Sequence, residues 1–197
     1  MSTRPFALFA AALLTACSSS PSKSGGSEDP SDWREPSNPI VKARLQARVD
    51  NIRYQKGTTL IANLERVAAY GPMALPVCTK GLSSDDAMTR MGCAYALGRI
   101  GDPGSIEPLQ GLLSDEVDFV RYEAASQLGN LGSRAGYPVL VQGLGDNRVE
   151  FRYKCFEALH ALTGHTFDYS HNAAPERRQV SVEKWQLWLK RIETEDF

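Results

Sequence analysis

The stretch RMGCAYALGRIGDPGSIEPLQGLLSDEVDF, residues 90–119, decides the fold because the chain repeats it. A shift of 31 positions lays it on RYEAASQLGNLGSRAGYPVLVQGLGDNRVEF, residues 121–151, and a second shift lays it on RYKCFEALHALTG, residues 152–164. A degraded copy, TLIANLERVAAYGPMALPVCTKGLSSDDAMT, precedes them at residues 59–89. Four columns share this register: Leu97, Leu128 and Leu159; Ile100, Leu131 and Leu162; Arg90, Arg121 and Arg152; Leu82, Leu113 and Leu144. A period of this length is typical of repeat architectures.

Each copy predicts two helices. Apolar residues recur at spacings of three and four through residues 93–113, which is the period of an amphipathic helix. Gly101 and Gly132 follow the last apolar position of the first helix, where glycine readily forms a left-handed C-cap. One such pair cannot bury its apolar face alone, so neighbours must stack. We therefore expect an all-α solenoid of stacked antiparallel helix pairs, with about four repeats.

The repeats resemble the short bacterial HEAT-like repeats that also occur in phycobiliprotein bilin lyases. The resemblance covers about residues 58–164 and rests on Ala94, Leu97, Gly98, Ile100, Gly101, Asp102, Pro108, Leu109, Asp115, Val120, Arg121, Ala124, Ala125, Leu128, Gly129, Leu131 and Gly132. HEAT proteins carry an Asp column and an Arg column that form a ladder. The resemblance implies such a structural ladder here, formed by Arg90, Asp115, Arg121, Asp146 and Arg152. The alternative is that the arginines form a positive stripe that binds anions.

The first 16 residues predict a signal peptide. The apolar run at residues 6–14 is too short to span a bilayer. Leu14, Thr15 and Ala16 precede Cys17 in a pattern that resembles a bacterial lipobox. That resemblance implies cleavage after residue 16 and a lipid anchor on Cys17; an ordinary secretory signal is the alternative.

Residues 17–38 are rich in Ser, Pro and Gly and predict a disordered tether behind the lipidated cysteine. We therefore expect the protein in the bacterial cell envelope, attached to a membrane through its lipid anchor. Ser18 stands where enterobacterial lipoproteins of the inner membrane carry Asp, which favours the outer membrane.

The two ends of the repeat region predict capping helices. Residues 39–56 form an amphipathic helix that caps the first repeat or rests on anionic lipid, and the repeats occupy residues 57–164. Residues 165–197 hold a loop and a longer helix with Trp185 and Trp188. These tryptophans seal the open end of the core, or they form an aromatic binding patch.

The sequence gives little evidence for nucleic-acid binding or for a metal site. The chain has 22 basic and 23 acidic residues, interleaved throughout, which excludes nucleic acid as the expected partner. His160, His165 and His171 are spaced five and six apart, unlike helical metal pairs. HEAT-like iron hydroxylases that modify lysine use repeated His-Glu pairs, and the chain holds no His-Glu dipeptide. We expect no metal and no other cofactor.

The cysteines of the repeats occupy core positions. Cys78, Cys93 and Cys155 replace apolar residues of the repeat frame, which predicts small buried side chains. Cys78 and Cys93 lie on adjacent predicted helices, so the sequence leaves a disulfide between them open.

A binding surface is the function that this pattern favours. In HEAT solenoids the second helices line the concave face, where we expect Thr79, Lys80, Gln110, Val141 and Gln142 to contact a protein or peptide. The resulting hypothesis is a non-enzymatic, membrane-anchored scaffold for an unidentified envelope protein. The alternatives are a HEAT-like lyase or cofactor-binding protein, and a purely structural spacer. The oligomeric state is unknown from sequence.

Overall fold

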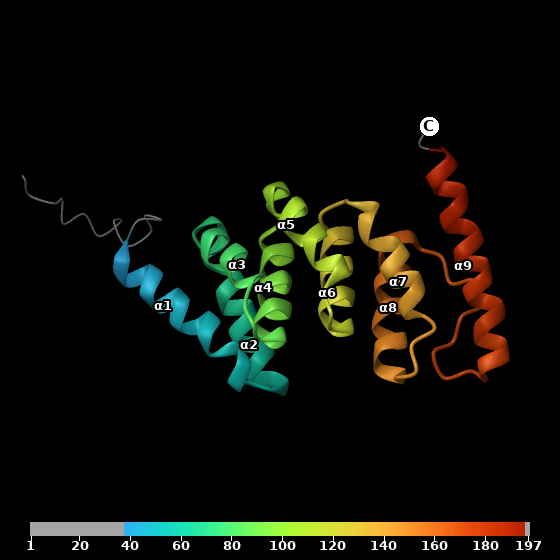
Figure 1. Cartoon of the computed structure of the whole chain (residues 1–197), viewed down its shortest axis with the longest axis horizontal. Coiled ribbons are helices and arrows are strands. Elements are labelled where there is room, and N and C mark those ends of the chain that lie inside the picture. Colours follow the sequence, from blue (N-terminus) through green and yellow to red (C-terminus); the bar gives the residue numbers. More distant parts are fainter. Residues whose placement is uncertain (1–37, 196–197) are drawn as a thin grey trace, which may run out of the picture.

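The computed structural model describes residues 38–195, which form nine α-helices and no strand within that range (Figure 1). The helices are α1 (Pro39–Asp50), α2 (Gly57–Ala68), α3 (Leu75–Gly81), α4 (Ala87–Ile100), α5 (Ile106–Gly111), α6 (Asp118–Asn130), α7 (Tyr137–Gly143), α8 (Val149–Thr163) and α9 (Pro175–Glu195). Short 3₁₀ turns join several of them. The predicted signal peptide, lipobox and Cys17, and all of the tether but Asn38, lie outside the described residues.

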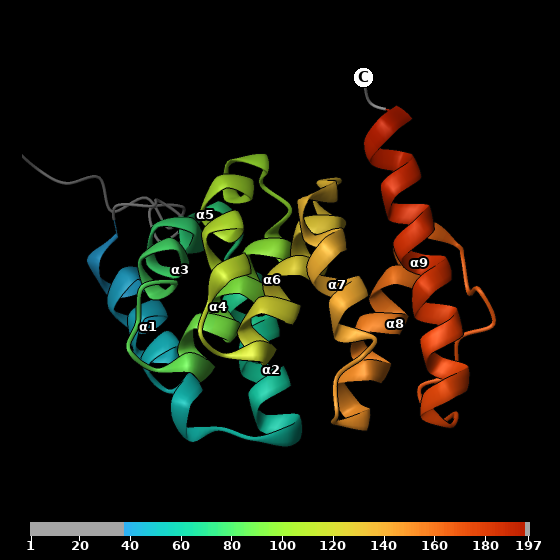
Figure 2. The same cartoon turned by 45° about the vertical axis from the view of Figure 1, so that its right-hand side comes forward.

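The helices stack as the repeat predicts, so the α-solenoid is confirmed. The long first helices form one layer, in which α4 packs against both α2 and α6, and α6 packs against α8. The short second helices α3, α5 and α7 each pack against the neighbouring long helix (Figures 1 and 2). At Gly101, φ is 78° and the N–H donates to the Leu97 carbonyl at 3.2 Å, which ends α4 with the left-handed cap.

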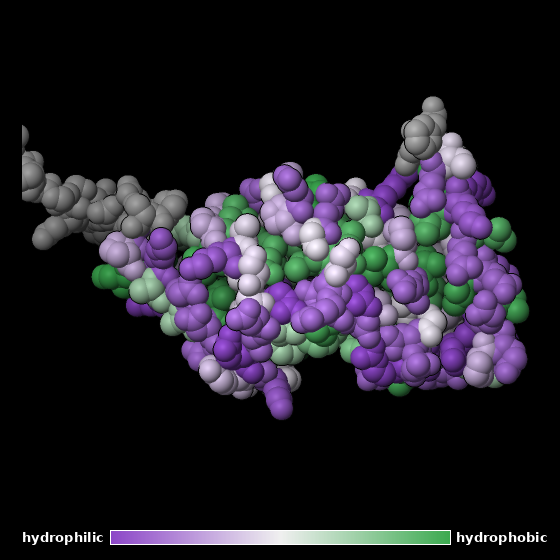
Figure 3. Space-filling view, viewed as in Figure 1, coloured by the Kyte–Doolittle hydropathy of each residue, from purple (hydrophilic) through white to green (hydrophobic). Residues whose placement is uncertain are grey.

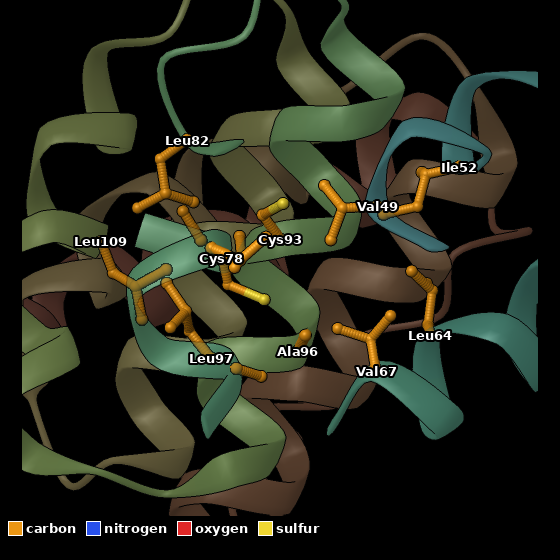
Figure 4. Close-up of a cluster of buried hydrophobic side chains, with 14 of the residues drawn as sticks. Val49, Ile52, Leu64, Val67, Cys78, Leu82, Cys93, Ala96, Leu97 and Leu109 are labelled. Carbon is orange, nitrogen blue, oxygen red and sulfur yellow. The ribbon is translucent and has the colours of Figure 1, made fainter. Parts of the chain in front are cut away.

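One apolar column of the repeat lies at the centre of the core. Leu97, Leu128 and Leu159 have no exposed area, one in each successive long helix. Burying a leucine side chain contributes about 1.5–3 kcal/mol, so these positions hold neighbouring layers together. Cys78 and Cys93 are also fully buried, and Figure 4 shows them close together among the apolar side chains of this cluster. Cys78, Cys93 and Cys155 are all free thiols.

Both ends of the described solenoid are closed by helices. On α1, Leu45 and Val49 are buried against the first repeat. At the other end α9 packs against α7, the place that a further second helix would otherwise take. Val182 and Trp185 of α9 are buried in the last core cluster. Apolar side chains remain exposed at the right-hand edge of the molecule in Figure 3. On α9, Val180 and Leu187 are exposed.

Candidate functional site

The predicted ladder residues lie near the starts of the long helices. Arg90, Arg121 and Arg152 lie in the first turns of α4, α6 and α8, and Asp115 and Asp146 lie in the loops before α6 and α8. Arg90 of α4 forms a two-pronged pair with Asp115 in the loop before α6, with Nε–Oδ2 and Nη2–Oδ1 distances of 2.7 and 2.9 Å. Its Nη1 also donates to the Ser84 and Asp85 carbonyls. Burial alone would raise the pKa of the Asp115 carboxyl, but hydrogen bonds from Arg90 and the Val117 N–H hold it below its ordinary value. This contact joins two repeats.

The next junction uses different partners. Arg121 donates to the Asp115 carbonyl at 2.7 Å and pairs with Asp118, which lies in the same helix, α6. Asp146 instead accepts from the Tyr122 hydroxyl at 2.9 Å and from Arg148. Hydrogen bonds from Arg148 lower the pKa of Asp146 to about 2. Arg148, which the sequence analysis did not single out, therefore takes the bridging role between Asp146 and Asp118.

Arg152, the last arginine of the column, donates its hydrogen bonds to backbone carbonyls. Arg152 donates through Nη1 to the Asp146 and Asn147 carbonyls, and through Nε to the His171 carbonyl at 3.0 Å. Arg152 Nε therefore donates to the His171 carbonyl, whereas Nε of Arg90 donates to the Asp115 carboxylate. Arg90 and Arg152 are both buried, and their guanidinium groups donate to the partners named above. They therefore do not form the exposed positive stripe that would bind anions.

The residues expected on the concave face do not all reach the surface. Thr79, Lys80, Gln110 and Gln142 are exposed on α3, α5 and α7. Val141 departs from the expectation, because it is 3% exposed and belongs to the core cluster. Lys80 lines a pocket between α1 and α3, and Gln142 lines a second pocket beside Arg148. Lys80 and Gln142 thus line two different pockets.

A third pocket lies at the C-terminal end, where sequence reasoning expected at most an aromatic patch. It measures about 450 Å³ and lies between the segment after α8 and one side of α9. Its lining is aromatic and basic: His165, Phe167, Lys184, Leu187, Trp188 and Arg191. The two tryptophans have separate roles, because Trp185 is fully buried in the core whereas Trp188 lines this pocket.

The wall of this C-terminal pocket has an unusual backbone. Phe167 and Asp168 have φ values of 46° and 59°, in the left-handed region that bulky residues rarely occupy. Two consecutive residues of this kind cost about 1–3 kcal/mol each, and such strain clusters at functional sites. Asp168 is held by Lys184 of α9, with a Nζ–Oδ2 distance of 3.0 Å. The loop thus contacts the helix that carries the pocket's basic residues.

The described residues do not fit a His-Glu iron centre. No group of three His, Cys, Asp or Glu side chains between residues 38 and 195 could hold a metal ion. His165 lines the C-terminal pocket, His160 Nδ1 lies 3.3 Å from the His165 carbonyl oxygen, and the ring of His171 lies against Tyr153. The histidines are thus engaged separately, and we derive no step through a metal.

Comparison with known families supports the solenoid. Residues 58–126 match the model for HEAT repeats, and residues 120–146 match the model for the PBS lyase HEAT-like repeat. The stacked helix pairs are therefore HEAT repeats. These matches agree with the resemblance seen in the sequence as far as the repeat type is concerned.

Similar curated proteins are named for an enzyme. The chain is 31% identical over 149 residues to a deoxyhypusine hydroxylase of Gibberella zeae, covering 66% of this chain and 44% of that protein. It is 41% identical over 94 residues to the deoxyhypusine hydroxylase of Neurospora crassa, covering 45% and 29%. For the Rattus norvegicus protein of the same name the identity is 32% over 94 residues, covering 47% and 31%. The chain thus spans less than half the length of these relatives.

These relatives correct the functional hypothesis. Proteins named as hydroxylases are enzymes, so the prediction of a non-enzymatic, membrane-anchored scaffold is wrong. The predicted bacterial envelope location is also contradicted, because these relatives come from eukaryotes. The physical reason is that the repeat residues pack the core, and a fold by itself does not identify a function. Among residues 38–195, no helix is both long and apolar enough to cross a membrane.

Proposed function

We propose that this chain is the HEAT-repeat part of an enzyme, and that it binds an organic cofactor or substrate. The C-terminal pocket carries this proposal, because it combines aromatic walls with basic side chains. Small-molecule sites are concave, mostly apolar, and contain a few placed polar groups, with volumes of about 300–1,000 Å³. The names of the relatives support the enzymatic part of the proposal.

The second helices supply a surface for a larger substrate. Thr79, Lys80, Gln110 and Gln142 are exposed polar residues that recur along α3, α5 and α7. Side chains of this kind bind a protein segment through hydrogen bonds and shape rather than through a strong field. In this proposal the solenoid holds a protein or peptide substrate, and the C-terminal pocket holds the small molecule.

Purified full-length protein tests the proposal directly. Its absorption spectrum, its metal content, and mass spectrometry of molecules released on denaturation would be measured on the same sample. We expect about one organic molecule per chain, as for a saturated single site. Protein that carries neither an organic molecule nor a metal would contradict the proposal. Stoichiometric iron without an organic molecule would contradict the choice of an organic cofactor.

A further inference from the structure

The C-terminal pocket contains a fixed aromatic surface. The Trp188 ring lies edge-on to Trp185 and His165, with centroid distances of 5.5 and 5.6 Å and interplanar angles of 87° and 69°. On another side the ring of Tyr137 lies 5.7 Å away. A ring held by three others loses little freedom when a ligand stacks on it. Trp188 is therefore preorganised to bind a planar group.

The same pocket carries positive charge on α9. Lys184 and Arg191 are seven residues apart, which places them about 10 Å apart along the helix axis. Both line the pocket, and Trp188 lies between them in sequence on the same side. Asp168 pairs with Lys184, but the two side chains are 88% and 44% exposed. Exposed pairs of this kind are weak, so an incoming anion can share Lys184.

The aromatic cluster behind the pocket contains an unsatisfied donor. The indole N–H of Trp185 is buried and meets no hydrogen-bond acceptor within the described part of the chain. Buried donors without partners are rare and call for a specific explanation, such as a bound water or ligand. Trp185 contacts Phe167, whose strained backbone forms the facing wall. The strained residue Phe167 thus lines the pocket, and the unsatisfied donor lies on the buried ring that packs against Phe167.

We propose that this pocket binds an aromatic ring that carries a phosphate, of nucleoside monophosphate size. The ring stacks on Trp188, and the phosphate lies against Lys184 or Arg191. Aromatic side chains are general stacking platforms for nucleobases, and Lys and Arg are the usual phosphate partners. This inference rests on the proposed function, because it names the class of small molecule that the enzyme holds.

Calorimetric titration of the full chain tests the inference. The probes are AMP, GMP, CMP and FMN, with adenosine and ribose 5-phosphate as half-ligands that lack the phosphate or the ring. We expect at least one nucleotide to bind at least tenfold more tightly than either half-ligand. Trp188→Ala should weaken that binding about tenfold, and so should at least one of Lys184→Gln and Arg191→Gln, whereas Trp188→Phe should retain most of it.

Lys190→Gln is the matched control. It removes the same charge from an exposed residue of α9 that does not line the pocket, so nucleotide affinity should not change. Circular dichroism and melting temperature establish that each variant is folded. The inference is overturned if none of the four nucleotides binds, or if folded Trp188→Ala binds as tightly as the unaltered chain.

The two proposals fail in different ways. A purified chain that carries an organic molecule which Trp188→Ala retains would support the proposed function and overturn the pocket assignment. A chain that carries nothing, yet binds a nucleotide in a Trp188-dependent manner, would support the pocket and contradict the claim of a resident molecule.

Discussion

Removal of the Asp115 carboxylate should destabilise the solenoid strongly. Asp115 is 6% exposed at its side chain and accepts two hydrogen bonds from Arg90, itself 9% exposed, and one from the Val117 N–H. Asp115→Ala removes the only buried carboxylate that pairs with Arg90 in the described residues. Arg90 Nη1 keeps its two carbonyls, and the one remaining carboxylate is the exposed Glu116, 3.6 Å from Nη2. Breaking one partner of a buried pair costs about 3–5 kcal/mol. We expect a loss of that size in the free energy of unfolding.

Asp118→Ala is the matched comparison, because it makes the same chemical change three residues further on, at the first residue of α6. Asp118 is 35% exposed and pairs with the partly exposed Arg121 and Arg148, so its removal should cost about 1 kcal/mol or less. Urea unfolding followed by circular dichroism at pH 7 measures both. Equal effects, or a loss below about 1 kcal/mol for Asp115→Ala, would refute the reasoning. In the double variant with Arg90→Met, part of the lost stability should return.

Three further predictions concern stability and reactivity. The pKa of Asp146 is lowered from 3.8 to about 2, so the pairing of its carboxylate stabilises the fold above about pH 4. This stabilisation, at most about 2 kcal/mol, is lost as the pH falls towards 2. Acid unfolding of the Asp146→Asn variant should lack this loss. Gly136→Ala should lower the free energy of unfolding in urea by about 1–3 kcal/mol, because a Cβ at this position would lie 2.6 Å from the Ala125 Cα. At Gly111 a Cβ would have no atom within 4 Å, so Gly111→Ala should lack this loss. Burial raises the pKa of Cys155 to about 12, so a disulfide reagent should label this thiol only after denaturation; rapid labelling of native protein would contradict its burial.

The core could be predicted, because apolar residues that recur at the same position of each repeat pack against one another. Leu97, Leu128 and Leu159 share a register, and each must face the next layer for the stack to close. The face of a short helix is harder to predict. Val141 and Gln142 are neighbours on α7, a helix of seven residues, and a small rotation decides which one is buried. Four columns of the repeat do not fix that rotation.

The C-terminal pocket depends on features without a sequence signal. Trp185 and Trp188 are three residues apart in the sequence, and the path of the preceding loop decides that one is buried and the other lines a pocket. That path requires left-handed backbone at Phe167 and Asp168. Neither residue is a glycine, the residue type from which a left-handed conformation is usually predicted. Arg148 could have been found, since it lies two residues after Asp146, but its reach to Asp118 depends on the stacking distance between repeats.

The buried Trp185 has a consequence for how this array can grow. It fills the last layer with one indole, whereas the inner layers are filled by leucines that recur every 31 residues. A copy of the unit added after residue 164 would meet this indole and the strained loop rather than an open layer. A copy inserted between two complete repeats would find matching leucines on both sides. Lengthening of the solenoid, by gene duplication or by engineering, is therefore confined to its interior.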